Sequence, residues 1–391
     1  MLWEVLGLLD LSAFTADAKA VEGKPGGALK SRRLLLALWG YALTQQIVSA
    51  REIARRVMPD SLDLAFRWLA ADVYVSHTLL SEFLVDHVEA MQALFTNVLH
   101  VLKREGLIFL PEHRTAQDGT RMCANAAMAS FRTRDKLEQA REQAELQLKA
   151  VLARMDDPPL PELQQQARER GAMDVLDRIK KAATVVEQLQ EQRSNSTSKK
   201  RQTTEPKGST TDPEARIMKM RHGGFEPAYN VQLAVVGSPM GGPATIVGVR
   251  VTNVGSDKNS ILPMYDQIAQ RTGHQLDAIL VDADHLTHEE VRAVREREHP
   301  LLVIAPVPKH WDRSEAPLDP AITAWIAQAK TEPMRTEYRA RKSLVERTNA
   351  VLKERFGLRQ LPVRGLRKVL CVVLLASVMV NLMQHGPVLL A

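Results

Sequence analysis

The chain has 391 residues, of which 45% are hydrophobic and 25% are charged, and its formal net charge is +6 at pH 7. This balance is that of a globular protein with enough residues for two or three domains, and it excludes a disordered or fibrous chain. The moderate positive charge permits a nucleic-acid partner without requiring one. The two cysteines, Cys123 and Cys371, have no metal-ligand spacing, which disfavours a disulfide framework and favours a reducing cytoplasm.

Residues 1 to about 110 are predicted to be helical. Apolar side chains recur three and four residues apart in stretches such as RRLLLALWGYAL, SAREIARRV and LAFRWLA. Ser49 is expected to cap a helix that presents Arg51, Arg55 and Arg56 within two turns. A helical domain with such a face is a candidate for DNA binding, and the alternative is a solvated, charged helix.

Two apolar stretches have the composition of membrane or signal segments. The first, SRRLLLALWGYALTQQIVSA, is interrupted by two glutamines, and the second, VLCVVLLASVMVNLM, reaches a polar residue at Asn381. A membrane span needs roughly 20 consecutive apolar residues. We therefore predict two buried core helices and no membrane partner.

Residues 132–211 have a different, more polar texture. Long helices are predicted up to about Gln192, and DDPPLP divides them into an antiparallel hairpin. In the second helix the apolar side chains are spaced three or four apart, as in a coiled coil: Ala172, Val175, Ile179, Ala182, Val186 and Leu189. The following segment, 191–211, is rich in Ser, Thr, Lys and Arg and is predicted to be a flexible linker.

Beyond the linker the apolar residues no longer recur with the 3.6-residue period of a helix and instead alternate every two residues, as in a strand. AYNVQLAVV and TIVGVRVTN are predicted to be paired antiparallel strands, and the strands LDAILVDADH and PLLVIAPV then alternate with helices. Two late helices are predicted at 335–356 and 366–385. This alternation indicates an α/β sheet covered by helices.

Three acidic residues are candidates for chemistry. Asp118 is either a turn residue, since Asp-Gly favours hairpin turns, or a metal ligand on a strand edge. Asp282 follows an apolar strand, at the end where ligands gather in α/β sheets. Glu346 lies on a helix whose one side carries Arg339, Lys342, Glu346, Asn349 and Lys353, and the alternative for it is a surface ion-pair lattice.

Two-metal phosphoryl transfer requires carboxylates of this kind. Several of them must converge on two Mg²⁺ or Mn²⁺ ions about 3.5–4 Å apart, which activate the attacking oxygen and stabilise the leaving oxygen. Hard divalent cations prefer oxygen ligands, so Asp and Glu suit them. Neighbouring Lys and Arg side chains would position the phosphates.

Several segments in this order resemble an insertion-sequence transposase with a DDE, ribonuclease H-like core. Three of them surround the acids: QDGTRMCANA, ILVDADHLTHEEV and YRARKSLVERTNAVLKERFGLRQLPVRGLRKV. The helical N-terminal stretches resemble the N-terminal region of the same family. The segment DPEARIMKMRHGGFEPAYNVQLAV resembles the part of the family that rejoins the core after a helical insert. The resemblance implies a metal-binding triad of Asp118, Asp282 and Glu346. It also implies DNA contacts from Tyr338, Arg341 and Lys353, with Arg339 as the alternative to Arg341 because Arg341 is one residue further from Glu346 than is usual.

The resemblance further implies an organisation and a function. The fold would be a ribonuclease H-like mixed α/β sheet flanked by helices, with an all-α domain at 1–110, core segments at 111–131 and 212–391, and the insertion at 132–211. The protein would be a bacterial, cytoplasmic and nucleoid-associated transposase, acting as a homodimer or larger synaptic complex. It would cut double-stranded DNA at its element's ends with two Mg²⁺ or Mn²⁺ ions and join the 3′ ends to target DNA. The alternatives are a metal-dependent nuclease without strand transfer and a transposase-derived DNA-binding protein.

Overall fold

The computed structural model forms two compact units. Unit 1 comprises Met1–Met122, Asn230–Pro362 and Arg367–Ala391, and unit 2 comprises Cys123–Tyr229 and Val363–Leu366. Within the whole chain the structure describes residues 2–15, 30–71, 73–108, 110, 114–153, 162–196, 199–237, 242–312 and 319–390.

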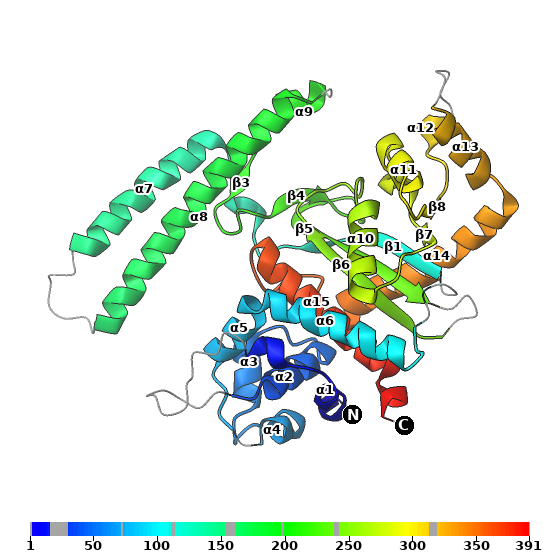
Figure 1. The fold of residues 1–391 in the computed structure, drawn as a ribbon. Helices are drawn as coiled ribbons and strands as arrows, with labels where there is room; N and C mark the ends of the chain where they lie inside the picture. The colour runs from blue at the N-terminus through cyan, green and yellow to red at the C-terminus, as the bar shows by residue number, and fades with distance from the viewer. Residues whose placement is uncertain are drawn as a thin grey trace. The chain divides into compact units, whose positions relative to one another are not determined.

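The first part of unit 1 is helical, as predicted (Figure 1). Its elements are α1 (Leu2–Gly7), the 3₁₀ turn η1 (Ser12–Phe14), α2 (Arg32–Thr44), α3 (Ala50–Arg56), α4 (Leu64–Ala70), α5 (His77–Asp86) and α6 (Val88–Arg104). The hydroxyl of Ser49 accepts a hydrogen bond from the Glu52 amide, so it caps α3 as expected. The predicted apolar helix α2 is buried on most sides.

The centre of unit 1 is a mixed sheet, which confirms the predicted α/β class. Its strands are β1 (Arg114–Cys123), β5 (Phe225–Gly237), β6 (Ala244–Thr252), β7 (Ala278–Leu280) and β8 (Leu302–Ile304), and β4 (Arg216–Lys219) pairs with the first part of β5. β5 pairs with β6 in antiparallel fashion, as predicted, and β1, β7 and β8 form parallel neighbours. β1 lies between β5 and β7.

Helices cover this sheet, and their bounds are α10 (Ile261–Thr272), η4 (Ala283–His285), α11 (His288–Arg295), α12 (Lys309–Asp312), α13 (Pro320–Ala329), α14 (Glu332–Ala350), η5 (Val351–Arg355) and α15 (Leu366–Leu389). The first late helix therefore begins before the predicted residue 335. It also changes at Val351 from α-helical to π-helical hydrogen bonding, and wide turns of this kind are frequent at functional sites.

The N-terminal helices are tied to the core through the end of α10. His100 Nε2 lies 2.7 Å from the carbonyl oxygen of Arg271, and Lys103 Nζ donates to the carbonyl of Thr272 at 2.9 Å. These carbonyls belong to the last turn of α10, where no further helical amide can donate to them. The contacts from α6 therefore satisfy groups that would otherwise need water.

Helix α15 is a buried core helix, as predicted. Among the described helices it alone is long and apolar enough to cross a membrane, with a mean hydropathy of 2.0, but 72% of its apolar window is buried inside the protein. Its polar Asn381 is fully buried and exchanges two hydrogen bonds with the backbone of Ile246, both 2.8 Å long. The apolar surface of α15 is thus explained by protein packing.

Unit 2 contains the helical hairpin. Its elements are η2 (Met128–Ser130), β2 (Phe131–Arg132), α7 (Arg134–Ala153), α8 (Glu162–Ser194), α9 (Lys199–Thr203), β3 (Gly208–Ser209) and β4 (Arg216–Lys219). α7 and α8 lie side by side (Figure 1) around a small core of Leu137, Ala144, Leu176, Ile179, Ala182 and Val186. The DDPPLP turn lies outside the described residues.

Two predictions for this unit differ from the structure. Val175 is 39% exposed and Leu176 takes its place in the hairpin core, because the buried stripe advances by three, three and four residues from Leu176. The segment predicted as a linker, 191–211, carries the end of α8, α9 and β3. β3 pairs with β2, and Gly208 lies so close to α8 that a Cβ there would be 2.6 Å from the carbonyl oxygen of Ala182. Backbone pairing therefore orders this polar sequence.

Candidate active site

Asp118 and Asp282 face each other across two neighbouring strands. In the parallel pair of β1 and β7, Ala116 is opposite Leu280. Side chains alternate between the two faces of a strand, so residues two positions further along lie on the same face of the sheet. These residues are Asp118, within β1, and Asp282, just beyond the end of β7. Asp118 therefore lies within a strand and the hairpin-turn alternative is wrong, while its role as a metal ligand stays a prediction.

An arginine from α14 links the two acids. Nη2 of Arg341 lies 2.7 Å from Oδ1 of Asp118 and 3.9 Å from Oδ2 of Asp282. The second oxygen of Asp118 accepts a hydrogen bond of 3.1 Å from Nδ2 of Asn349 on the same helix. Asp118 is thus held by α14 at both of its oxygens.

A second ion pair fixes α14 against the sheet. Arg114, at the start of β1, donates two hydrogen bonds to Glu337, one of them 2.6 Å long between Nη2 and Oε1. Hydrogen bonding from Arg114 lowers the pKa of the Glu337 carboxyl. Because the pair is bidentate and only partly exposed, it restrains the helix one turn before Arg341.

The charges around Asp118 do not cancel. Burial raises the pKa of its carboxyl, and the guanidinium of Arg341 opposes that rise. The negative charges of Asp257 and Asp282 raise the pKa further. Two other carboxylates therefore act on Asp118 here, and one arginine lies between Asp118 and Asp282.

Asp257 is a member of this cluster that the sequence pattern does not reveal. It lies in the loop GSDKNS after β6, and a Cβ on Gly119 would stand 2.1 Å from its Oδ1. Glycine is thus required beside Asp118 because Asp257 fills the space. Polar loops such as this one are common, so only the tertiary structure identifies its acid.

Several buried polar atoms at this site have no hydrogen-bond partner among the described residues. They are both ring nitrogens of His285, Nε of Arg341 and Oδ1 of Asn349. His285 is 1% exposed and lies within the electrostatic influence of Asp257, Asp282 and Arg341, and burial lowers its pKa to about 4. Buried polar groups are normally paired, so such a concentration indicates a place where a polar ligand or water binds.

The remaining residues of the predicted site occupy different positions. Tyr338 is half-buried close to the acids: burial raises its pKa most, followed by the charge of Asp282. Arg339 is exposed and pairs with Glu332 at the start of α14, so Arg341 is the arginine at the acids. Glu346 is half-buried one turn before Asn349, and Lys353 is half-buried in the π-helical turn.

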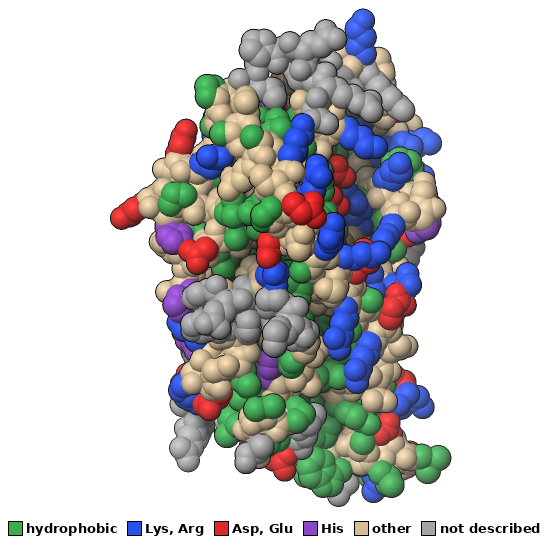
Figure 2. All heavy atoms as spheres, turned by 90° about the vertical axis from the view of Figure 1, so that its right-hand side faces the viewer, with side chains coloured by type: hydrophobic (Ala, Val, Ile, Leu, Met, Phe, Trp, Pro, Cys, Tyr) green, Lys and Arg blue, Asp and Glu red, His purple; other side chains and the backbone are tan. Residues whose placement is uncertain are grey.

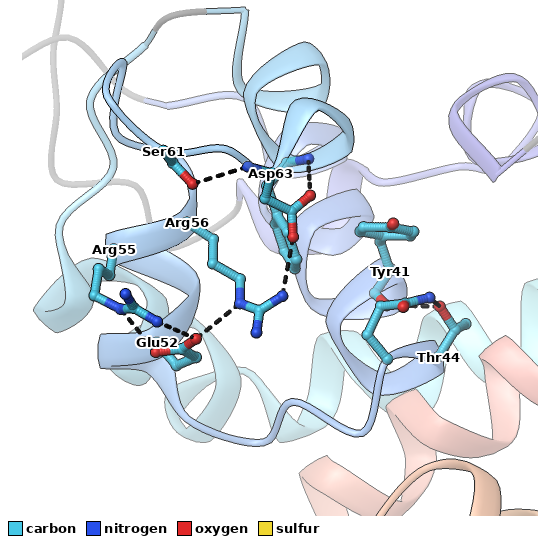
Figure 3. Close-up of polar contacts among 9 residues, drawn as sticks. Tyr41, Thr44, Glu52, Arg55, Arg56, Ser61 and Asp63 are labelled. Carbon is cyan, nitrogen blue, oxygen red and sulfur yellow. Dashed lines mark hydrogen bonds and ion pairs between the residues drawn. The ribbon is translucent and has the colours of Figure 1, made fainter.

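The arginines of α3 form a local network. Arg55 and Arg56 both donate to Glu52, and Arg56 also reaches Asp63, which caps α4 (Figure 3). These contacts connect α3 to α4 and offset part of the positive charge that was predicted to face DNA. Arg51 is exposed on the same helix.

We expect this network to stabilise the N-terminal helices in a pH-dependent manner. Hydrogen bonds from Arg55 and Arg56 lower the pKa of Glu52 from 4.5 to about 2. Since the folded-state value is the lower one, the stabilisation is complete above pH 4.5 and is lost as the pH falls towards 2. Glu52→Gln should lower the free energy of unfolding by no more than about 1 kcal/mol at pH 7, because the pairs are partly exposed.

Urea unfolding of the wild type and Glu52→Gln at pH 7 and pH 2.5 measures this effect. The difference in the free energy of unfolding between the wild type and Glu52→Gln should be smaller at pH 2.5 than at pH 7. The control is Glu105→Gln, which removes an exposed acid paired with the neighbouring Arg104. If the free energies of unfolding of the two proteins differ by the same amount at both pH values, the ion pairs of Glu52 are not the source of the stabilisation.

The donor chemistry of the site suits a hard divalent cation. The site offers carboxylate oxygens from Asp118 and Asp282 and an unpartnered amide oxygen from Asn349. Oxygen ligands of this kind suit such a cation, and the single arginine does not offset the negative charge of the carboxylates. Of the residues that the structure describes, no group of three His, Cys, Asp or Glu side chains is gathered closely enough to hold a metal ion. The ligand types therefore suit such a cation, while Arg341 occupies the position between the two aspartates.

Comparison with known proteins identifies the C-terminal part of this site. Residues 315–385, which include α14 and most of α15, match the family model described as Transposase DDE domain. This match confirms the resemblance to the DDE transposases that the sequence motifs indicated. No curated protein and no solved structure matches the chain.

Proposed function

We propose that this chain, whose residues 315–385 match the transposase DDE domain model, is a DDE transposase that binds the ends of its own insertion sequence, cuts them and joins the 3′ ends to target DNA. One observation carries the proposal. Asp118 and Asp282 share a face of the sheet and a single arginine, and that arginine comes from the matched segment. Two distant acids and a transposase helix thus converge on one place.

Each residue has a role in this proposal. Asp118, Asp282 and Glu346 would hold two Mg²⁺ or Mn²⁺ ions, which when bound activate the attacking oxygen and stabilise the leaving oxygen of a phosphodiester. Arg341 and Asn349 orient Asp118 from α14. Arg341 would also offset charge on the phosphate, because a planar guanidinium binds carboxylates and phosphates alike.

Tyr338 and Lys353 are the proposed DNA contacts near the cleaved bond. Tyr338 lies beside the acids on α14, and Lys353 follows on the π-helical turn. The hydroxyl of Tyr338 is a donor suited to a phosphate oxygen, and the ammonium of Lys353 is a compact positive charge. Both residues would position the DNA backbone without reading its sequence.

The fold and the partners complete the proposal. The strand order β4-β5-β1-β7-β8, with β6 also paired with β5 and Asp118 on β1, supports a ribonuclease H-like core. Figure 2 shows a face on which Lys and Arg side chains gather along one side, as phosphate binding requires. The N-terminal helices, through Arg51 and through Arg55 and Arg56, would bind double-stranded DNA. A homodimer or larger assembly in the bacterial cytoplasm, close to the nucleoid, would bring the two element ends together.

A cleavage and joining assay tests this function. The purified chain is incubated with the DNA that flanks its reading frame, Mg²⁺ or Mn²⁺ and a supercoiled target plasmid. End cleavage followed by joined products is the expected result. Cleavage without joining would indicate a nuclease, and end binding without cleavage would indicate a DNA-binding protein that has lost its chemistry.

A further inference from the structure

The carboxylate of Asp257 packs against the backbone next to Asp118, the first acid of the proposed site. Its Oδ1 lies over Gly119, the residue after Asp118, with no room for a Cβ between them. Its charge acts on Asp118 and also on His285. Asp257 comes from the loop between β6 and α10, so a third segment of the core contributes an acid here.

A network of amides holds Asp257 in this position. Nδ2 of Asn230 donates to its Oδ1 at 2.7 Å, and Nε2 of Gln232 donates to the same oxygen at 2.5 Å. Both donors lie on β5, next to β1. Gln232 in turn accepts a hydrogen bond of 3.2 Å from Gln117 on β1, so the sheet itself fixes the carboxylate.

The buried imidazole of His285 points to a ligand at the same place. His285 is 1% exposed, and neither of its ring nitrogens has a partner among the described residues. Among charged groups, Asp257, Arg341 and Asp282 have the largest electrostatic effects on it. A buried polar side chain without a partner destabilises the fold, so a ligand or water that binds here is expected to compensate for it.

The hydrogen bonds alone do not explain why residue 257 is acidic. An asparagine would offer the same Oδ1 to Asn230 and Gln232 without adding negative charge beside Asp118. Like charges in a partly buried place oppose each other and destabilise the fold unless a cation lies near them. The acid is therefore costly for folding and useful for binding a cation.

We propose that Asp257 is a positioning residue of the cation site, whose fixed negative charge beside Asp118 increases the affinity for the divalent ion. This inference rests on the proposed function, because it assumes that Asp118 and Asp282 hold the metal. Asp257 acts through Asp118: it keeps the acid's surroundings negative and, through Gly119, keeps the strand at a fixed distance from the loop. The exposed charge of an ordinary surface acid would have no such effect.

The test is Mn²⁺ binding by the full chain without DNA, followed by the electron paramagnetic resonance signal of the free ion. Asp257→Asn keeps an oxygen for both amide donors and removes only the charge. We expect its Mn²⁺ dissociation constant to rise at least about tenfold, the usual effect of losing a group that supports metal ligands. Its thermal unfolding midpoint should not fall, since a like-charge repulsion is removed.

Two further variants make the outcomes distinct. Asp118→Asn should abolish the same binding, and Asp277→Asn, which removes an exposed acid before β7, should leave it unchanged. If Asp118→Asn weakens binding and Asp257→Asn does not, the inference about Asp257 is wrong while the proposed function stands. If the wild type binds no Mn²⁺ at millimolar concentration, the proposed cation site itself fails, and the inference fails with it.

Discussion

Asp118→Asn is expected to reduce DNA end cleavage at least about 1,000-fold, which corresponds to about 4 kcal/mol of transition-state stabilisation. The asparagine keeps an oxygen for the amide of Asn349 and the same volume, but its amide nitrogen cannot accept the hydrogen bond from Arg341. What it loses is the charge that would bind the metal. Asp282→Asn and Glu346→Gln should have effects of the same size, because all three acids are proposed to act on the same pair of ions.

End binding separates a loss of chemistry from a loss of folding. Each of the three variants should be folded at pH 7, as followed by urea unfolding, and should shift labelled end DNA at the same protein concentration as the wild type. Asp277→Asn is the matched control, since it removes an acid five residues before Asp282 at a position where the side chain is 70% exposed. Cleavage at the wild-type rate in any of the three would remove that residue from the site.

Asp282 could be singled out from the local sequence pattern, whereas Asp118 was assigned from the motifs that resemble a transposase. An apolar run followed by a polar segment marks the end of a buried strand, and Asp282 lies at that point. The register of β1 with β7 then places Asp118 beside it. Glu346 has no comparable local pattern, since an acid on a charged helix is usually part of its surface. It was identified from the order of the motifs, and its placement among metal ligands stays a prediction.

The choice between Arg339 and Arg341 shows where sequence spacing is insufficient. Both lie on α14, two residues apart, and their spacing from Glu346 does not decide between them. The orientation of the helix decides it, and that orientation is set by the Arg114–Glu337 ion pair and by apolar contacts such as that of Leu344 with Gly237. These are tertiary contacts between residues more than 100 positions apart.

Asp257 and the segment 191–211 were missed for a similar reason. Both are polar stretches without hydrophobic periodicity, and such stretches usually form loops or linkers. Asp257 is significant only because Asn230 and Gln232 hold it beside Gly119. In the same way, Gly208 and Ser209 form a strand only because Phe131 and Arg132 supply the partner backbone.

Asn381→Leu is expected to lower the free energy of unfolding by about 3–5 kcal/mol. Asn381 lies on α15 and is fully buried, and its amide donates to the carbonyl of Ile246 and accepts from the amide of the same residue. Ile246 belongs to β6, so the side chain of Asn381 satisfies the backbone of that strand in the way that a neighbouring strand would. Leucine is of similar size, but it would leave both backbone groups buried without partners, at about 1–3 kcal/mol each.

The same substitution tests whether α15 is a core helix of this protein, because leucine makes the helix more apolar. If α15 faced lipid, Asn381→Leu would stabilise the folded protein. In the core described here, the same substitution destabilises the folded protein. Urea unfolding at pH 7, followed by circular dichroism at 222 nm, measures the change. Gln384→Leu is the control, since it makes the same kind of replacement at a half-buried position one turn later on α15. It should change the unfolding midpoint little, and an equal loss in both variants would show that the contact between Asn381 and Ile246 is not the cause.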